Sequence, residues 1–152
     1  MATHFTALDH IDREILRILR DDGRIGWSEL GARVHLSANA AAERVRRLRR
    51  SGVIRRFTVE IDQAALGRTL EAVIDVRVAT GNRFHDVLRE CDEVTWMAHV
   101  TGRTDYQVHV ACAGTDGLQR LLTRFRDEFG AVETLTTVVL ESLRREHPEV
   151  AR

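Results

Sequence analysis

The sequence predicts an α+β chain in which three helices and a β segment precede a βαββαβ series of elements. Two observations lead to this expectation. Apolar residues recur at helical spacing three times before residue 51, and from residue 70 onward runs of alternating apolar residues are separated by two further helical stretches. The short stretch from Gln63 to Thr69, which contains a glycine, separates the two patterns. We therefore expect a winged helix-turn-helix domain over residues 1–62 and a ferredoxin-like domain over residues 63–152.

The first two helices are expected to be short and amphipathic. Asp9 is the expected N-cap of the first, whose apolar stripe runs over residues 8–20 and stops at the Asp21-Asp22-Gly23 turn. The second is expected from Trp27 to about Val34, followed by the turn His35-Leu36-Ser37. Together with the third helix they are expected to bury a small core, made of Ile11, Ile15, Leu30, Val34, Val45 and Leu48.

The third helix carries five arginines in the seven positions from 44 to 50 and stops at Gly52. Ala41, Val45 and Leu48 recur at i, i+4 and i+7, so they form its buried stripe and the arginines lie on the opposite face. A recognition helix meets base edges toward its amino end, and the alternating segment from Val53 to Ile61 would follow it as a wing. The expected DNA-binding residues are Ser37 as N-cap, Asn39, Ala40, Glu43, Arg44 and Arg47 near bases, and Arg46 and Arg50 near phosphates.

Charge is distributed unevenly although the formal net charge is zero. Residues 1–62 hold 12 basic and 9 acidic side chains, whereas residues 63–152 hold 11 and 14. All 23 basic residues are arginine, which can contact phosphate or guanine with paired hydrogen bonds. Seven arginines stand against one acid between Glu43 and Arg56. A solvated charged face is the plain alternative, but this density favours double-stranded DNA as the partner.

The second half of the chain is predicted from alternation and capping residues. Strands are expected over residues 70–79, 94–101, 105–113 and 131 to about 143, and helices over 82–91, capped by Asn82, and from Thr115 or Asp116 to Phe129. An antiparallel sheet of this kind has helices on one face only. The other face, expected to present Val73, Met97, His99 and Leu135, would then be covered by dimerisation.

Several classes of site are disfavoured by the sequence. The chain has two cysteines, Cys91 and Cys112, and no signal peptide or long apolar run, so we expect a cytoplasmic protein with free thiols and no membrane segment. No Cys-x-x-Cys or helical histidine pair indicates a metal site. The best enzyme-like set is His99, His109, Cys112 and Asp105, in which the two histidines could share one face of the sheet. It lacks any catalytic motif, so neither an enzyme nor a cofactor is expected.

A set of motifs in fixed order spans both predicted domains. They are Leu8-Asp9, Ile11-Asp12-Arg13, Ile15-Leu16, Asp22-Gly23-Arg24, Leu36-Ser37, Arg44-Val45, Arg47-Leu48, Gly52-Val53-Ile54, Thr101-Gly102, Asp105-Tyr106 and a threonine-rich last strand. In these motifs the chain resembles the Lrp/AsnC, or feast/famine, family of transcription regulators, whose second domain is also called the RAM domain.

The resemblance implies a dimer, often assembled into tetramers or octamers, that binds DNA through paired winged helices and responds to an amino acid or a related metabolite. It also implies an effector pocket at contacts between dimers, formed by Thr101, Gly102, Arg103, Thr104, Asp105, Tyr106, Thr134 and Thr136. In such a pocket Asp105 could pair with an α-ammonium group, and Gly102 would let a ligand approach the backbone closely. The plainer alternative is a hairpin turn in which Asp105 is only a cap.

The chain departs from the family pattern at a few positions. Gly26 stands where a serine or threonine cap is usual and Gly31 where alanine is usual, so each is expected to weaken the second helix by about 1 kcal/mol. His35 replaces a common glycine. The Arg103-Thr104 pair is also unusual, which leaves open a ligand-independent DNA-binding regulator or an architectural protein. A module whose helix-turn-helix binds protein is a further alternative, disfavoured by the arginine density.

Overall fold

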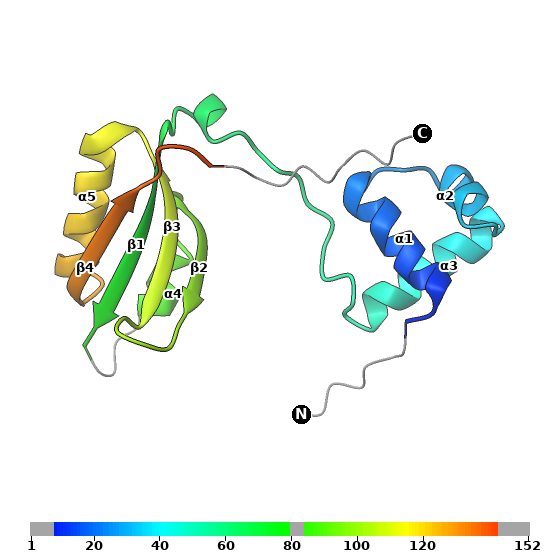
Figure 1. Ribbon diagram of the computed structural model, residues 1–152, viewed down its shortest axis with the longest axis horizontal. Coiled ribbons are helices and arrows are strands. Elements are labelled where there is room, and N and C mark those ends of the chain that lie inside the picture. Colours follow the sequence, from blue (N-terminus) through cyan, green and yellow to red (C-terminus); the bar gives the residue numbers. More distant parts are fainter. Residues whose placement is uncertain (1–7, 80–83, 143–152) are drawn as a thin grey trace. The chain divides into compact units, whose positions relative to one another are not determined.

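The computed structural model describes residues 8–79 and 84–142, and their contacts divide them into two compact units between Glu60 and Ile61. The N-terminal unit holds three helices, α1 (His10–Asp21), α2 (Trp27–Arg33) and α3 (Ala38–Arg50), which pack together as a helix-turn-helix (Figure 1). Its buried apolar cluster consists of Ile15, Ile18, Ile25, Leu30, Val34, Ala41, Val45 and Leu48. The predicted α+β class and the three helices are confirmed.

Capping residues fix where these helices begin and end. The carboxylate of Asp9 accepts a hydrogen bond of 2.7 Å from the backbone N–H of Asp12, as expected of an N-cap. The hydroxyl of Ser37 does the same for Ala40 at the start of α3, over 3.2 Å. At the other end of α3, Gly52 takes a left-handed φ of 74° that side chains disfavour, which stops the helix.

The turn between α2 and α3 brings two backbones into close approach. A Cβ at Gly31 would lie 2.6 Å from the carbonyl oxygen of Leu36, so alanine does not fit there. The expectation that Gly31 weakens α2 relative to alanine is therefore wrong, because tertiary packing outweighs helix propensity at this position. His35 has a φ of 57° in the same turn, a conformation that glycine adopts at lower cost.

The predicted wing is not a strand. Between α3 and the C-terminal unit, the segment from 53 to 61 is irregular, and Val53, Phe57, Val59 and Ile61 are all exposed. Alternation predicts an extended segment but cannot supply the second strand that a ladder requires. The wing prediction is therefore wrong for a single chain. The next regular element after this segment is a 3₁₀ turn, η1 (Ala64–Leu66).

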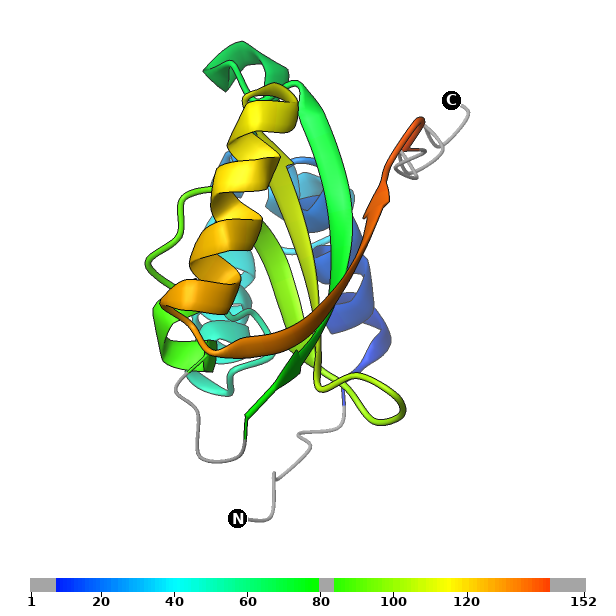
Figure 2. The same ribbon diagram turned by 90° about the vertical axis from the view of Figure 1, so that its left-hand side faces the viewer.

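The C-terminal unit is a four-stranded antiparallel sheet with two helices. Its elements are β1 (Leu70–Val78), α4 (Phe84–Leu88), β2 (Val94–His99), β3 (Tyr106–Cys112), α5 (Gly114–Asp127) and β4 (Ala131–Val138). The strand order is β2-β3-β1-β4, the ferredoxin-like arrangement predicted from the βαββαβ series. Figure 2 shows α5 lying along one face of the sheet.

Three element boundaries differ from prediction. The first helix of this unit is shorter than the expected 82–91, and its predicted cap, Asn82, lies outside the described residues. Helix α5 begins at Gly114 without a side-chain cap, so Thr115 and Asp116 lie inside its first turn. Strand β4 ends at Val138, before the predicted end near residue 143.

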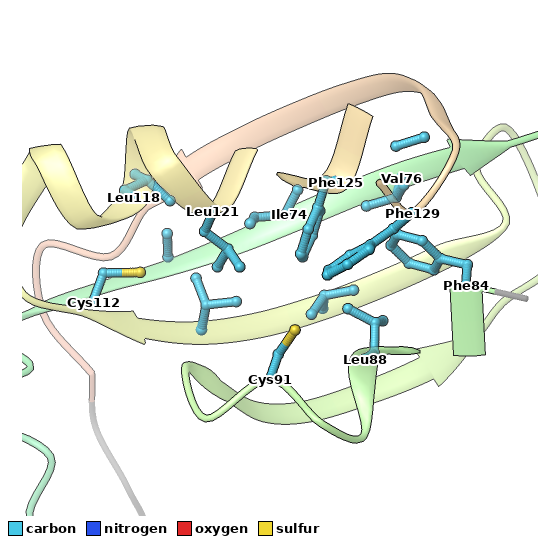
Figure 3. Packing of buried hydrophobic residues seen from close by; sticks show 14 residues of the cluster. Ile74, Val76, Phe84, Leu88, Cys91, Cys112, Leu118, Leu121, Phe125 and Phe129 are labelled. Carbon is cyan, nitrogen blue, oxygen red and sulfur yellow. The ribbon is translucent and has the colours of Figure 1, made fainter. Parts of the chain in front are cut away.

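The core of the C-terminal unit lies between the helices and one face of the sheet (Figure 3). Phe84 of α4 packs edge-on against Phe125 of α5, with ring centroids 5.3 Å apart, and Phe129 lies 5.8 Å from Phe125. Below these rings, alternate residues of the two central strands fill the layer, namely Ala72, Ile74, Val76, Val108, Val110 and Cys112. Both cysteines are buried and free, and burial raises the pKa of each thiol.

The uncovered face of the sheet, here called the bare face, carries a different set of residues from the predicted one. Val73 and Leu135 lie on it as expected. Met97 packs on the core and His99 stacks on Tyr106, so their assignment to this face is wrong. The cause is an irregularity between Val94 and Trp96 that inverts the alternation, because a bulge adds one residue to the strand.

We predict that His35→Gly stabilises the N-terminal unit by about 1 kcal/mol, because it removes a side chain from a left-handed backbone position. Gly31→Ala should destabilise the unit by about 1–3 kcal/mol, since the new Cβ meets backbone. Urea unfolding followed by circular dichroism measures both. Gly26→Ala is the control, because a Cβ there meets nothing within 4 Å. A Gly31→Ala protein as stable as the parent would contradict the close approach.

Candidate nucleic-acid interface and effector loop

Four of the five arginines of α3 fall into two groups with different partners. Arg46 and Arg50 extend from the outer face of the helix, with side chains 61% and 65% exposed. Each pairs with Glu43, over 3.2 Å and 2.7 Å respectively. The hydrogen bonds from Arg50 and then Arg46 lower the pKa of Glu43, which therefore stays ionised among the arginines. Asn39 is also exposed and Ala40 half-exposed on this side of the helix.

The second group turns toward α1. Arg44 donates to the carboxylates of both Asp9 and Asp12, and its side chain is only 25% exposed. Arg47 donates to both oxygens of Asp12 over 2.8 Å and 2.7 Å. The hydrogen bond from Arg44, with that from the Asp12 backbone, lowers the pKa of Asp9. Hydrogen bonds to the carboxylates of Asp9 and then Asp12 raise the pKa of Arg44.

Asp12 is the functional residue that sequence reasoning missed. It is 1% exposed and is the one buried charged side chain among the described residues. Its position four residues after Leu8 and three before Ile15 interrupts the apolar stripe of α1, which was the available signal. A carboxylate on an apolar stripe requires a buried cationic partner. The arginines that pair with Asp12 are selected by the rotation of α3 relative to α1. Sequence periodicity does not give that rotation.

An open hollow of about 540 Å³ lies beside the arginines in the N-terminal unit. Arg46 and Arg49 of α3 line it together with Arg24 from the loop before α2. Two aromatic side chains, Trp27 and Phe57, are 47% and 45% exposed at its edges. Phe57, predicted to lie in the wing strand, instead comes back toward Gly23. The hollow therefore extends the basic surface beyond α3.

The predicted effector residues gather at one end of the sheet. The loop from Thr101 to Asp105 joins β2 to β3, with Gly102 at a left-handed φ of 124° and Thr101 to Arg103 exposed. Val76 of β1 is paired with Tyr106 on one side and Thr134 on the other. These three residues therefore form one row across the sheet, while Thr136 lies in the next such row, opposite Ile74.

Asp105 has a structural role in this loop. Its backbone N–H donates to the carbonyl of Val76 over 2.9 Å, and its carboxylate accepts a hydrogen bond of 2.9 Å from the N–H of Val78. Its own carbonyl accepts from Val100 over 2.9 Å. The capping alternative is thus present in the structure. A carboxylate has two oxygens, so capping with one leaves ligand binding by the other chemically possible.

The enzyme-like residues are not brought together. His99 stacks on Tyr106 at 4.9 Å, on the side of the sheet that faces the helices. His109 packs edge-on against Trp96 at 4.9 Å on the bare face, so the two histidines lie on opposite faces. Within residues 8–79 and 84–142, no three His, Cys, Asp or Glu side chains are grouped to hold a metal ion. In the same ranges, no helix is long and apolar enough to cross a membrane.

Comparison with known proteins gives the same division of the chain. Residues 8–49 match the AsnC-type helix-turn-helix domain, and residues 71–149 match the Lrp/AsnC ligand-binding domain. The transcriptional regulator AldR of Mycolicibacterium smegmatis is 35% identical over 147 residues, which cover 93% of this chain and 86% of AldR. LrpA of Mycobacterium tuberculosis is 34% identical, over 90% of this chain and 92% of LrpA.

Solved structures of similar fold are also found. The feast or famine regulatory protein Rv3291c of M. tuberculosis, complexed with L-methionine, superposes with a TM-score of 0.87 at 31% identity. The superposition covers 95% of this chain and all of that one. AldR of M. tuberculosis gives a TM-score of 0.74 at 30% identity, over 91% of this chain and 97% of that one.

Proposed function

The chain belongs to the Lrp/AsnC family of transcription regulators, and we propose that it reads double-stranded DNA with the outer face of α3. Regulation of transcription through a helix-turn-helix is the role of its relatives, and it is not an enzymatic one. The observation that supports the proposal is the exposed face that bears Glu43, Arg46 and Arg50. Because chromosomal DNA is the proposed partner, we place its action in the cytoplasm.

We propose separate tasks for the residues of this face. Asn39, Ala40 and Glu43 follow the Ser37 cap and are assigned to base edges, where asparagine can pair with adenine and glutamate can accept from cytosine. Arg46 and Arg50 are assigned to phosphates, since their side chains are more than half exposed. The base-reading role expected for Arg44 is replaced by a structural one, because its guanidinium is taken up by Asp9 and Asp12.

We propose an amino acid or a related metabolite as effector, bound at the end of the sheet near the loop from Thr101 to Asp105. The L-methionine complex of Rv3291c supports this class of ligand. Asp105 would offer one oxygen to the ammonium group, while hydroxyls of Thr134 and Thr136 and the free amides near Gly102 would receive the carboxylate. Arg103, Thr104 and Tyr106 complete the proposed set.

We propose that two chains pair through the bare face, and that dimers assemble further into tetramers or octamers. Trp96 and Leu135 are 50% and 64% exposed on this face, with Val73 between their strands. Large apolar side chains exposed on an uncovered sheet face, with polar side chains around them, are typical of an interface. Paired helix-turn-helix units would then address half-sites about one helical turn apart, near 34 Å. An effector would act by its differential affinity for two assemblies.

The DNA-reading assignment predicts two kinds of loss. Asn39→Ala should cost about 1–3 kcal/mol on the preferred sequence and little on others, because it removes a base contact. Arg50→Ala should weaken binding to all sequences alike and lower the salt slope by about 1, because it removes a phosphate contact. Fluorescence anisotropy on specific and scrambled DNA measures both. Arg17→Ala on α1 is the control, and equal losses for Asn39→Ala on both DNAs would contradict its base contact.

Asp105→Asn separates the two roles of this residue. The amide oxygen can still accept from the N–H of Val78, so the loop should keep its fold, but the charge that attracts an ammonium group is lost. We expect the amino-acid response of DNA binding to disappear while DNA affinity stays the same. Asp116→Asn, on the exposed side of α5, is the control. A normal response would leave Asp105 as a cap only, and a wild-type protein without any response would favour the ligand-independent alternative.

Leu135→Arg tests the bare face as an interface. A charge placed at Leu135 loses its hydration when the face is covered, so the variant should dissociate to monomers in sedimentation velocity. Leu66→Arg makes the same chemical change at a side chain of similar exposure in η1 and should leave the assembly intact. Unchanged assembly of Leu135→Arg would exclude the bare face.

A further inference from the structure

We propose that Asp12 is a positioning residue that keeps the guanidinium groups of Arg47 and Arg44 away from DNA phosphates. In this way Asp12 raises the preference of the protein for its specific DNA sequence. The inference rests on the proposed DNA-reading role of α3. The inference adds a role for α1, because the Asp12 carboxylate determines which guanidinium groups of α3 are available to DNA.

The contacts of Asp12 involve both of its oxygens. One receives hydrogen bonds from Arg44, over 2.9 Å, and from Arg47, over 2.8 Å. The other receives a hydrogen bond of 2.7 Å from the same nitrogen of Arg47. The Asp12 side chain is 2% exposed, so water does not compete for these bonds. Charge-assisted hydrogen bonds in such a setting are strong and hold the guanidinium groups in place.

Arg47 lies at the boundary between this ion pair and the DNA-reading face. Its side chain is 46% exposed, against 25% for Arg44, so Arg47 would meet phosphates if its guanidinium were released. Attraction between arginine and phosphate carries no sequence information and supplies most of non-specific binding. A carboxylate that neutralises one arginine therefore lowers non-specific affinity and leaves base contacts unaffected.

Two matched pairs of residues also fix the rotation of α3. Asp9, the N-cap of α1, and Asp12 are three residues apart, and so are Arg44 and Arg47 on α3. Rotating α3 by a single residue would move its side chains by about 100° and break both contacts. The same ion pairs thus direct Glu43, Arg46 and Arg50 outward.

The test is Asp12→Asn in the full-length chain, with DNA binding measured by anisotropy across a range of salt concentrations. We expect affinity for scrambled DNA to rise about fivefold or more, and the slope of log K against log salt to steepen by about 0.9 for each arginine released. The ratio of specific to scrambled affinity should fall accordingly. Glu14→Gln removes a carboxylate of the same helix that pairs with Arg17, and it should change none of these values.

A double variant identifies the released arginine. Asp12→Asn combined with Arg47→Gln should return scrambled-DNA affinity and salt slope to wild-type values, because Asp9 still holds Arg44. Equal loss of affinity for both DNAs by Asp12→Asn, at unchanged salt slope, would overturn the proposal and leave Asp12 a structural role only.

Arg47→Gln alone keeps the proposal testable if Asp12→Asn does not fold. We expect its scrambled-DNA affinity to stay within about twofold of wild type, whereas a slope lower by about 1 would mean that Arg47 already contacts phosphate. Wild-type protein in the same series separates the two claims. A wild type without sequence preference refutes the DNA-reading role and this inference together, whereas preference with an unresponsive Asp12→Asn refutes the inference alone.

Discussion

A carboxylate removed from water has to be neutralised, and Asp12 meets this requirement by drawing Arg44 and Arg47 of α3 onto α1. The rest of the N-terminal unit depends on that contact. One side of α3 is buried by apolar packing against α1 and α2. The ion pairs determine which of its arginines stay exposed to solvent. The exposed basic face therefore consists only of the arginines that are not bound by the carboxylates near α1, and Arg44 and Arg47 do not contribute to it.

In the C-terminal unit the helices cover one face of the sheet, and the other face carries exposed large apolar side chains among polar ones. Phe84 and Phe125 close the covered side, whereas Trp96 and Leu135 stay exposed on the other. The row that joins Tyr106, Val76 and Thr134 places the loop before β3 at the same end of the sheet as Thr134, with β1 between them. Covering one face by a second chain and placing a ligand at the end of the sheet are compatible, since they use different residues.

Periodicity and capping residues were sufficient to predict most elements, because each local signal agreed with the final fold. Asp9 and Ser37 cap the helices they were expected to cap. The predictions that were wrong failed for physical reasons that the pattern of apolar residues in the sequence does not show. A bulge near Trp96 inverted the faces of β2, and the segment around Phe57 had no strand to pair with. In the candidate site, residue types were predictable, but the partition of arginines depended on the angle between α1 and α3.

The most direct test of the central claim is the binding of the full-length protein to DNA from upstream of its own gene, compared with scrambled DNA, over a range of salt concentrations. An exposed arginine face that reads DNA predicts tighter binding to the upstream sequence and a steep linear fall of log K with log salt. Equal affinity for both DNAs, or binding that hardly changes with salt, would contradict this account and favour a helix-turn-helix that docks on protein.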